Sequence, residues 1–145
     1  MSHSLCKIWI HAIWGTKERI PLIESKIEKP LYDCMYGEFI KVNSPARIIN
    51  GMPDHVHSLF LLNTQKCLAD IIKQVKGSSS HHVNLNDLIP SKFAWQTGYA
   101  AYSVSESMLE KTFLYIQHQK ENHKTKSFQE EYEEFLKFHG YSGGE

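Results

Sequence analysis

Two histidines separated by one residue lie in the stretch GMPDHVHSLFLL, residues 51–62. Side chains alternate between the two faces of a β-strand, so His55 and His57 would lie on one face, roughly 6.5 to 7 Å apart, with Val56 on the other. Neutral imidazole is the commonest side-chain ligand for metal ions, and two imidazoles on one face can share one cation. The pattern predicts part of a metal site, unless the pair simply lies half-exposed at the start of a strand.

A second chemical group lies in ESMLEKTFLYIQHQKEN, residues 106–122. Tyr115 and Gln119 are four residues apart, which places them one turn apart on the same face of a helix. A tyrosine hydroxyl can act as a nucleophile and form a covalent intermediate. Gln119 offers a neutral oxygen ligand. If this helix lies beneath the strand, His55, His57 and Gln119 supply three ligands and leave positions open for substrate oxygens. A tyrosine at the core edge and a solvated glutamine are the ordinary alternative.

The elements that must position these residues follow the order β, α, β, β, α, β, α, with a further helix at the end. We predict strands at residues 5–14, at 46–50, from His55 onward, and on either side of a turn at Gly98 within 93–105. Helices are predicted at 22–42 despite Pro30, from 68 to a stop at Gly77, in a short piece within 81–90, at 106–122 and at 127–138. The last helix starts with a capping-box pattern, and the tail from residue 139 is expected to fray.

This order predicts an α+β fold close to the ferredoxin-like split β-α-β arrangement. Its antiparallel sheet would carry helices on one face, and the tyrosine-bearing helix would follow towards the C-terminus. The other face would then be free for a site or a partner. Because no linker, repeat or low-complexity tract divides the chain, we expect a single domain over residues 1–145.

The composition restricts the classes of function. A hydrophobic fraction of 41% suits one folded core, and a formal net charge of zero means that a nucleic-acid partner would need a local basic patch. No run of 18 apolar residues predicts a membrane span. The three cysteines are unclustered and the N-terminal stretch lacks the pattern of a signal peptide, so we expect a reduced, cytoplasmic protein.

Several segments, taken in order and spacing, carry a family resemblance. The segments PDHVHSLFLL, FAWQTGYAAYSVSES and YIQHQKENHK closely resemble the single-tyrosine HUH transposases, a class that comprises insertion-sequence TnpA transposases and REP-associated tyrosine transposases. IWIHAIWGTKERIPLI near the start and FQEEYEEFL near the end belong to the same resemblance, which therefore covers nearly the whole chain.

The resemblance implies a function and a set of residue roles. His55 and His57 match the HUH motif, Gln119 matches the third metal ligand, and Tyr115 matches the catalytic tyrosine. Members of the family bind hairpin-forming single-stranded DNA and cut and rejoin it, with a 5′-phosphotyrosine intermediate and a free 3′ hydroxyl. They act as homodimers, and in several the tyrosine helix of one subunit completes the site of the other. We expect Mg²⁺ or Mn²⁺ as the cofactor, with Mn²⁺ the better match to imidazole.

Four basic residues are candidates for contacts with DNA phosphates, although each fits a solvated charged surface as well: Lys17, Arg19, Lys73 and Lys76. A domesticated copy that processes repeats, or a descendant that only binds DNA, is the main alternative function. A small hydrolase of the histidine-triad type would need a third histidine at position 59, where this chain has Leu59, and no downstream glutamate is placed for a cupin.

Overall fold

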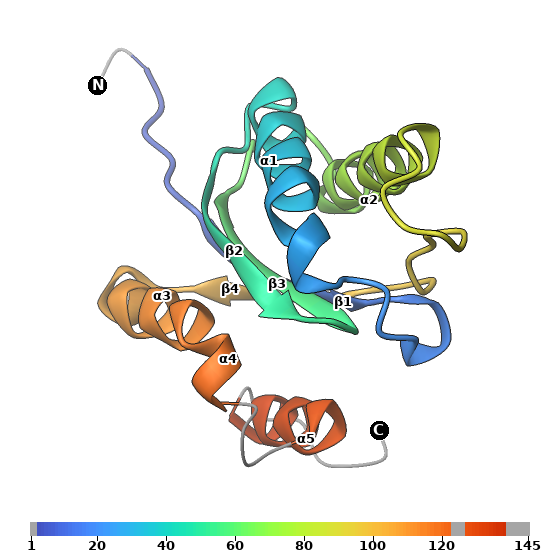
Figure 1. Ribbon diagram of the computed structural model, residues 1–145. Helices are drawn as coiled ribbons and strands as arrows, with labels where there is room; N and C mark the ends of the chain where they lie inside the picture. Colours follow the sequence, from blue (N-terminus) through green and yellow to red (C-terminus); the bar gives the residue numbers. More distant parts are fainter. Residues whose placement is uncertain (1–2, 123–126, 139–145) are drawn as a thin grey trace.

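In the computed structural model, which describes residues 3–122 and 127–138, four strands form one antiparallel sheet in the order β2-β3-β1-β4 (Figure 1). The strands are β1 (Trp9–Gly15), β2 (Ala46–Met52), β3 (His55–Leu61) and β4 (Ala100–Val104). Strands β2 and β3 form a hairpin in which Met52 pairs with His55. This strand order is that of the split β-α-β arrangement, so the predicted fold class is confirmed.

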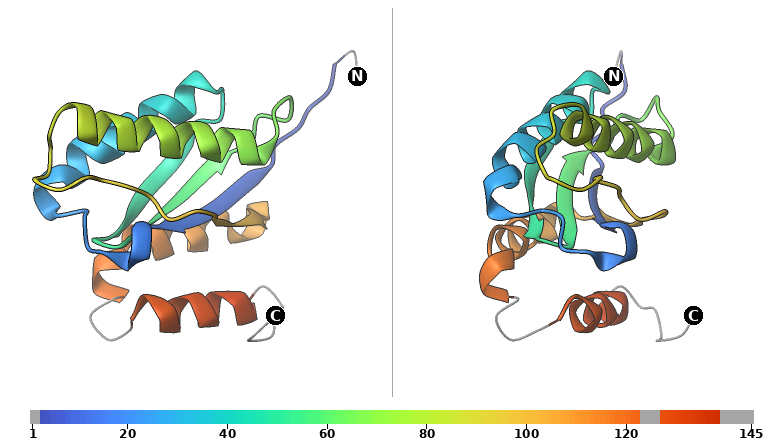
Figure 2. Two further views of the ribbon diagram at one scale, coloured as in Figure 1. Left: turned by 90° about the vertical axis from the view of Figure 1, so that its right-hand side faces the viewer. Right: turned by 45° about the vertical axis from the view of Figure 1, so that its right-hand side comes forward.

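Helices α1 (Ser25–Lys41) and α2 (Leu68–Leu85) lie side by side over one face of the sheet (Figure 2). The alternating strand residues that face them are apolar, among them Ala12, Val56 and Phe60. The Phe60 ring packs against Phe39 of α1 with 4.7 Å between ring centroids. Burying an aromatic side chain of this size contributes about 1.5 to 3 kcal/mol. The larger of the two hydrophobic clusters lies in this layer, which therefore forms the main core of the fold.

The opposite face of the sheet carries the later helices α3 (Leu109–Gln117), α4 (Gln119–Asn122) and α5 (Phe128–Phe138) (Figure 2). A smaller core joins α3 to β2 and β3 through Leu109, Ile116, Ile48 and Leu59. Two 3-10 turns, Lys17–Arg19 and Glu106–Met108, complete the elements of the described residues. The face that we expected to be free for a site therefore carries the tyrosine-bearing helix α3.

Helix α2 does not stop at Gly77, so that prediction is wrong. The helix continues through Gly77 and three serines to Leu85, because Val75, Ser79 and Val83 recur at helical spacing and are all buried. The hydroxyl of Ser79 donates to the carbonyl of Lys76 at 3.1 Å and therefore satisfies a bond within the helix itself. The short helix expected within residues 81–90 is the end of α2.

The segment before β4 also differs from the prediction. Residues 93–99 form no regular strand but a connection that touches the sheet at one bridge, between Trp95 and Thr16. The indole of Trp95 donates to Ser79 at 3.0 Å, and its ring packs against Phe93, so this segment packs onto α2 instead of extending the sheet. At the chain end, the backbone N–H of Glu130 donates to Ser127 as the capping pattern predicted, and the tail expected to fray lies outside the described residues.

Within the two described ranges, none of the helices combines the length and hydrophobicity that a membrane span needs.

Candidate metal and nucleophile site

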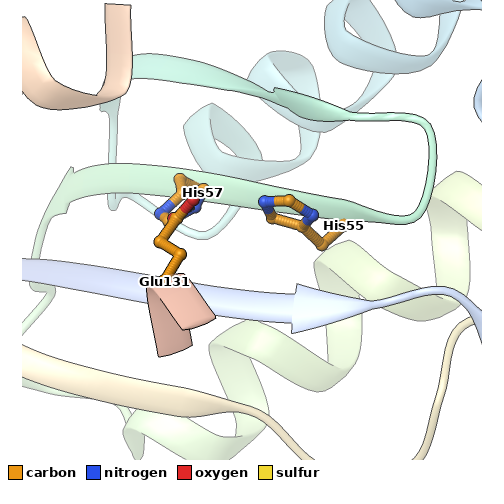
Figure 3. A group of neighbouring side chains, drawn as sticks. All are labelled: His55, His57 and Glu131. Atoms are coloured by element: carbon orange, nitrogen blue, oxygen red, sulfur yellow. Dashed lines mark ion pairs between the residues drawn. The ribbon is translucent and has the colours of Figure 1, made fainter. Parts of the chain in front are cut away.

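Strand β3 presents two fully buried histidines on the face that carries α3. His55 and His57 lie on the same side of β3, as predicted, with 5.2 Å between their ring centroids (Figure 3). Leu59 continues this face into the smaller core, while Val56 and Phe60 belong to the core under α1 and α2. The strand alternation therefore separates the histidine site from the main core.

The side chains beside the two rings orient them. His55 Nδ1 lies 2.8 Å from Asp54 Oδ1, and His57 Nδ1 lies 2.9 Å from His11 Nε2. Burial acts to raise the pKa of Asp54, but the hydrogen bond with His55 and the nearby Arg19 hold that pKa below its usual range. The Asp54 carboxylate beside Nδ1 orients the ring so that Nε2 faces the site.

Two more polar side chains meet the histidines from other elements. The Oε1 atom of Gln119, which is fully buried, lies 3.4 Å from His55 Nε2. Glu131 reaches in from α5 and places Oε1 2.8 Å from His57 Nε2 (Figure 3). The Gln119 amide N–H donates to the same Glu131 oxygen at 3.4 Å. The sequence analysis did not select Glu131, although it is the one glutamate of QEEYEE with helical spacing to both Phe128 and Phe135, three residues before it and four after it.

These donors fit a divalent cation. Among the described residues, ligand atoms of His55, His57 and Glu131 lie within 4.8 Å of one another. Gln119 Oε1 adds an amide oxygen beside His55 Nε2, and a cation between these two atoms could bind both. Neighbouring ligands of one ion, each about 2.1 Å from it, lie roughly 3.0 to 3.5 Å apart, close to the 3.4 Å measured here. The set of nitrogen and oxygen donors suits Mn²⁺ or Mg²⁺.

The helix that bears Tyr115 does not run unbroken to Gln119. It leaves helical geometry at His118, with φ −97° and ψ 24°, so the prediction of one helix over 106–122 is wrong. The Asn50 side chain of β2 donates to the carbonyls of Ile116 and Gln117 at 3.1 and 3.2 Å. These bonds end α3 against the sheet, and Gln119 then reaches the site from the separate turn α4.

A lysine holds α4 in place. The Lys120 ammonium donates to Asn50 Oδ1 at 3.0 Å and to the Gly51 carbonyl at 2.6 Å, and it pairs with Glu28 of α1 at 2.8 Å. One side chain therefore joins α4 to the end of β2 and to the helix on the other side of the sheet. Gln119, which precedes it, is positioned by this anchor.

Tyr115 lies on α3 beside the histidines. Its ring centroid is 5.7 Å from that of His57 and 6.3 Å from that of His11. Burial raises the pKa of the phenol, the Glu131 carboxylate raises it further, and a hydrogen bond with Gln119 opposes them. The phenol is therefore protonated at neutral pH in this arrangement. A cavity of about 650 Å³ opens beside it, lined by the side chains of Ser103, Lys111 and Glu134 among others, and gives room for a substrate segment.

Of the four basic residues predicted to contact DNA, Lys17, Lys73 and Lys76 lie beside one connection, residues 94–98. The Lys17 backbone N–H donates to the Ala94 carbonyl at 3.0 Å, and Lys76 donates to the carbonyls of Gln96 and Gly98 at 2.8 Å each. Burial lowers the pKa of Lys76. Arg19 lies 3.7 Å from an Asp54 oxygen, and Lys73 lines a second cavity of about 510 Å³ between α2 and this connection.

A split β-α-β sheet that turns a His-Val-His strand towards a tyrosine helix is the arrangement of the single-tyrosine HUH transposases. Comparison with known families agrees with the geometry. The chain belongs to the family described as IS200-like transposases, whose model matches residues 4–119. Helix α5 and Glu131 lie beyond the matched residues.

Individual relatives point to the same class. The chain is 27% identical over 118 residues to the ISDra2 transposase TnpA of Deinococcus radiodurans, a match that covers 77% of this chain and 84% of the relative. The crystal structure of a proposed transposase from Deinococcus radiodurans R1 matches with a TM-score of 0.65 and 24% identity, over 82% of this chain and 95% of that one. A REP-associated tyrosine transposase bound to a REP hairpin matches with a TM-score of 0.59 and 14% identity, over 85% and 74% of the two chains. At these identities the two structures support the fold.

Proposed function

We propose that this protein is a transposase that cleaves and rejoins hairpin-forming single-stranded DNA, with Tyr115 as the nucleophile. The observation that carries the proposal is the position of Tyr115, whose ring centroid lies 5.7 Å from that of His57. The chain also belongs to the IS200-like transposase family. In the cleavage step the phenolic oxygen bonds to the scissile phosphorus, the bond to the 3′ oxygen breaks, the phenol loses its proton and the 3′ oxygen leaves as a hydroxyl. A 3′ hydroxyl from another DNA end reverses the attack and releases Tyr115.

His55, His57 and Gln119 are the proposed ligands of a divalent cation, Mg²⁺ or Mn²⁺. When bound, the cation would polarise the scissile phosphate and offset the charge that develops on it. Asp54 and His11 hold the two imidazoles in orientation through bonds of 2.8 and 2.9 Å. Burial and Glu131 raise the pKa of Tyr115, and the positive charge of a cation beside the phenol would lower it and so favour loss of the proton.

The proposed substrate is a DNA hairpin with a single-stranded flank. The REP-associated relative is bound to a hairpin, and family membership of this chain supports the same kind of partner. Lys17, Arg19, Lys73 and Lys76 are the proposed phosphate contacts, and the position of three of them, Lys17, Lys73 and Lys76, beside residues 94–98 supports a shared surface. We further propose that residues 1–145 act as one domain within a homodimer.

A covalent-adduct assay tests the proposal. Labelled single-stranded oligonucleotides that carry the palindromes nearest the gene are incubated with the protein and Mn²⁺ or Mg²⁺, then resolved on a denaturing gel. We expect a protein–DNA adduct that disappears with chelator and in Tyr115→Phe. Tyr99→Phe, which removes the hydroxyl of an exposed tyrosine, is the matched control and should keep the adduct. Tight hairpin binding without an adduct would instead identify a descendant that only binds DNA.

A further inference from the structure

The most informative residue outside the family match is Glu131. It lies on α5, beyond the matched residues 4–119, yet its carboxylate is at the centre of the histidine site and only 6% of the residue is exposed. Its Oε1 atom lies 2.8 Å from His57 Nε2 and 3.4 Å from the Gln119 amide nitrogen. Burying a carboxylate costs free energy unless positive charge or hydrogen bonds compensate it, so the buried position of Glu131 needs a physical explanation.

The exposure of α5 points to the same residue. Among the side chains that the structure describes on α5, Glu131 is buried and Tyr132 half-buried, while Gln129, Glu130, Glu133, Glu134 and Lys137 are exposed. The helix carries four glutamates and one lysine, and DNA phosphates would be repelled by such a surface. A contact with DNA therefore does not explain why α5 lies on this face, whereas a cation held by Glu131 would.

The coordination chemistry supports a direct bond. His55, His57 and Gln119 are neutral ligands, so a divalent cation held by them alone would keep its full charge in a buried site. One carboxylate halves that net charge and raises the oxygen donors from one to two, which Mg²⁺ and Mn²⁺ favour. The Glu131 oxygen lies 2.8 Å from His57 Nε2, slightly closer than adjacent ligands on one ion, so a small outward shift of the carboxylate would admit the ion.

We propose that Glu131 is a fourth protein ligand of the divalent cation, and that this bond fastens α5 over the site that contains Tyr115. The inference rests on the proposed function, because it concerns the same cation. It adds a ligand from outside the family match and makes docking of the C-terminal helix depend on the metal.

Metal binding in the full chain, without DNA, tests the inference. Mn²⁺ is titrated by calorimetry into the wild type, Glu131→Gln, Glu130→Gln and His57→Ala. Glu130→Gln makes the same charge change on an exposed neighbour and is the matched control. We expect Glu131→Gln to weaken Mn²⁺ binding at least tenfold and Glu130→Gln to leave it within about twofold of wild type.

Hydrogen exchange of the α5 amides is a second measurement, and a general effect of charge on Mn²⁺ binding would not change it. Mn²⁺ should slow exchange of the α5 amides in the wild type and in Glu130→Gln, but not in Glu131→Gln. Circular dichroism of each variant confirms that it is folded, and the near-isosteric Gln keeps the volume of Glu131. The absorption bands of Co²⁺ bound in place of Mn²⁺ should also change in Glu131→Gln, because they report the ligand set directly.

The outcomes separate this inference from the proposed function. Wild-type Mn²⁺ affinity in Glu131→Gln, with binding lost in His57→Ala, would overturn the role of Glu131 and leave the histidine site standing. More DNA adduct in Glu131→Gln at unchanged Mn²⁺ affinity would also overturn that role, since Glu131 would then obstruct the site. If the wild type binds no Mn²⁺, the metal site of the proposed function fails together with this inference.

Discussion

Replacing Gly51 by alanine should damage the hairpin that carries the histidines. Gly51 is buried in β2 and pairs with Val56 of β3. A Cβ atom there would run into the carbonyl oxygen of His55 and lie 2.8 Å from the Cα of Val56. Both are backbone atoms of β3, so no side-chain rotation can make room. The two strands must separate, and His55 moves with them.

The size of the effect follows from two opposing terms. Forcing a methyl group into a tightly packed position costs about 1 to 3 kcal/mol, and contact with backbone favours the upper part of that range. Alanine also lowers the conformational entropy of the unfolded chain relative to glycine, which stabilises the folded protein by about 0.4 to 1 kcal/mol. We expect Gly51→Ala to lower the free energy of unfolding by about 1 to 2 kcal/mol and to weaken Mn²⁺ binding as well.

Gly37 and Gly77 provide matched controls with the same chemical change. Both lie inside helices, and a Cβ at either position meets nothing within 4 Å. Alanine there should stabilise the protein by about 0.5 to 1 kcal/mol and leave Mn²⁺ binding intact. Urea unfolding and calorimetric Mn²⁺ titration measure both quantities. Wild-type stability and Mn²⁺ affinity in Gly51→Ala would refute the argument that close strand contact at Gly51 fixes His55.

Two further substitutions test the site and the core. Asp54→Asn should weaken Mn²⁺ binding by about tenfold in calorimetry, because His55 loses its charged acceptor at 2.8 Å, while the exposed Asp33→Asn should have no effect. Equal affinities in both would exclude the orienting role. Glu38→Gln should cost about 1 to 2 kcal/mol in urea unfolding at pH 7, because it breaks a 2.9 Å ion pair with Lys41 at a buried carboxylate. Burial opposes ionisation, but hydrogen bonds such as that from Lys41 hold the pKa of Glu38 below its ordinary value. The stabilisation is therefore complete above the ordinary pKa and is lost as the pH falls through the folded-state pKa, so the stabilities of the two proteins should converge in acid. A difference in stability that does not shrink as the pH is lowered would show that charge is not its source.

Local patterns predicted the parts of this fold that local physics decides. Alternation along β3 placed both histidines on one face, and this is confirmed because the period of a strand is fixed by its backbone. The predicted stop of α2 at Gly77 was wrong. Glycine inside a helix costs only about 1 kcal/mol relative to alanine, and the burial of Val75 and Val83 outweighs that cost. Helix propensity is a weak guide wherever a continuous buried face exists.

Glu131 shows what the sequence could not reveal. Four glutamates lie within five residues of α5, and only Glu131 has helical spacing to both Phe128 and Phe135. This spacing indicates that Glu131 lies on the apolar face of the helix, but its contact with the histidines depends on how α5 docks, which is a tertiary property. The same holds for the break at His118. It depends on the Asn50 side chain, which lies 66 residues away from Ile116 in the sequence and accounts for the end of α3 only once β2 is in place.

The register between β2 and β3 links the nucleophile to its metal ligands. Asn50 pairs directly with His57 across the two strands, and its side chain holds the carbonyls that end α3. The residue that faces a histidine ligand in the sheet therefore also fixes the helix that bears Tyr115. A shift of one residue in this register would turn the histidines to the other face and move Asn50 away from α3. The distance between Tyr115 and His57 therefore depends on strand pairing in the sheet as well as on the packing of α3.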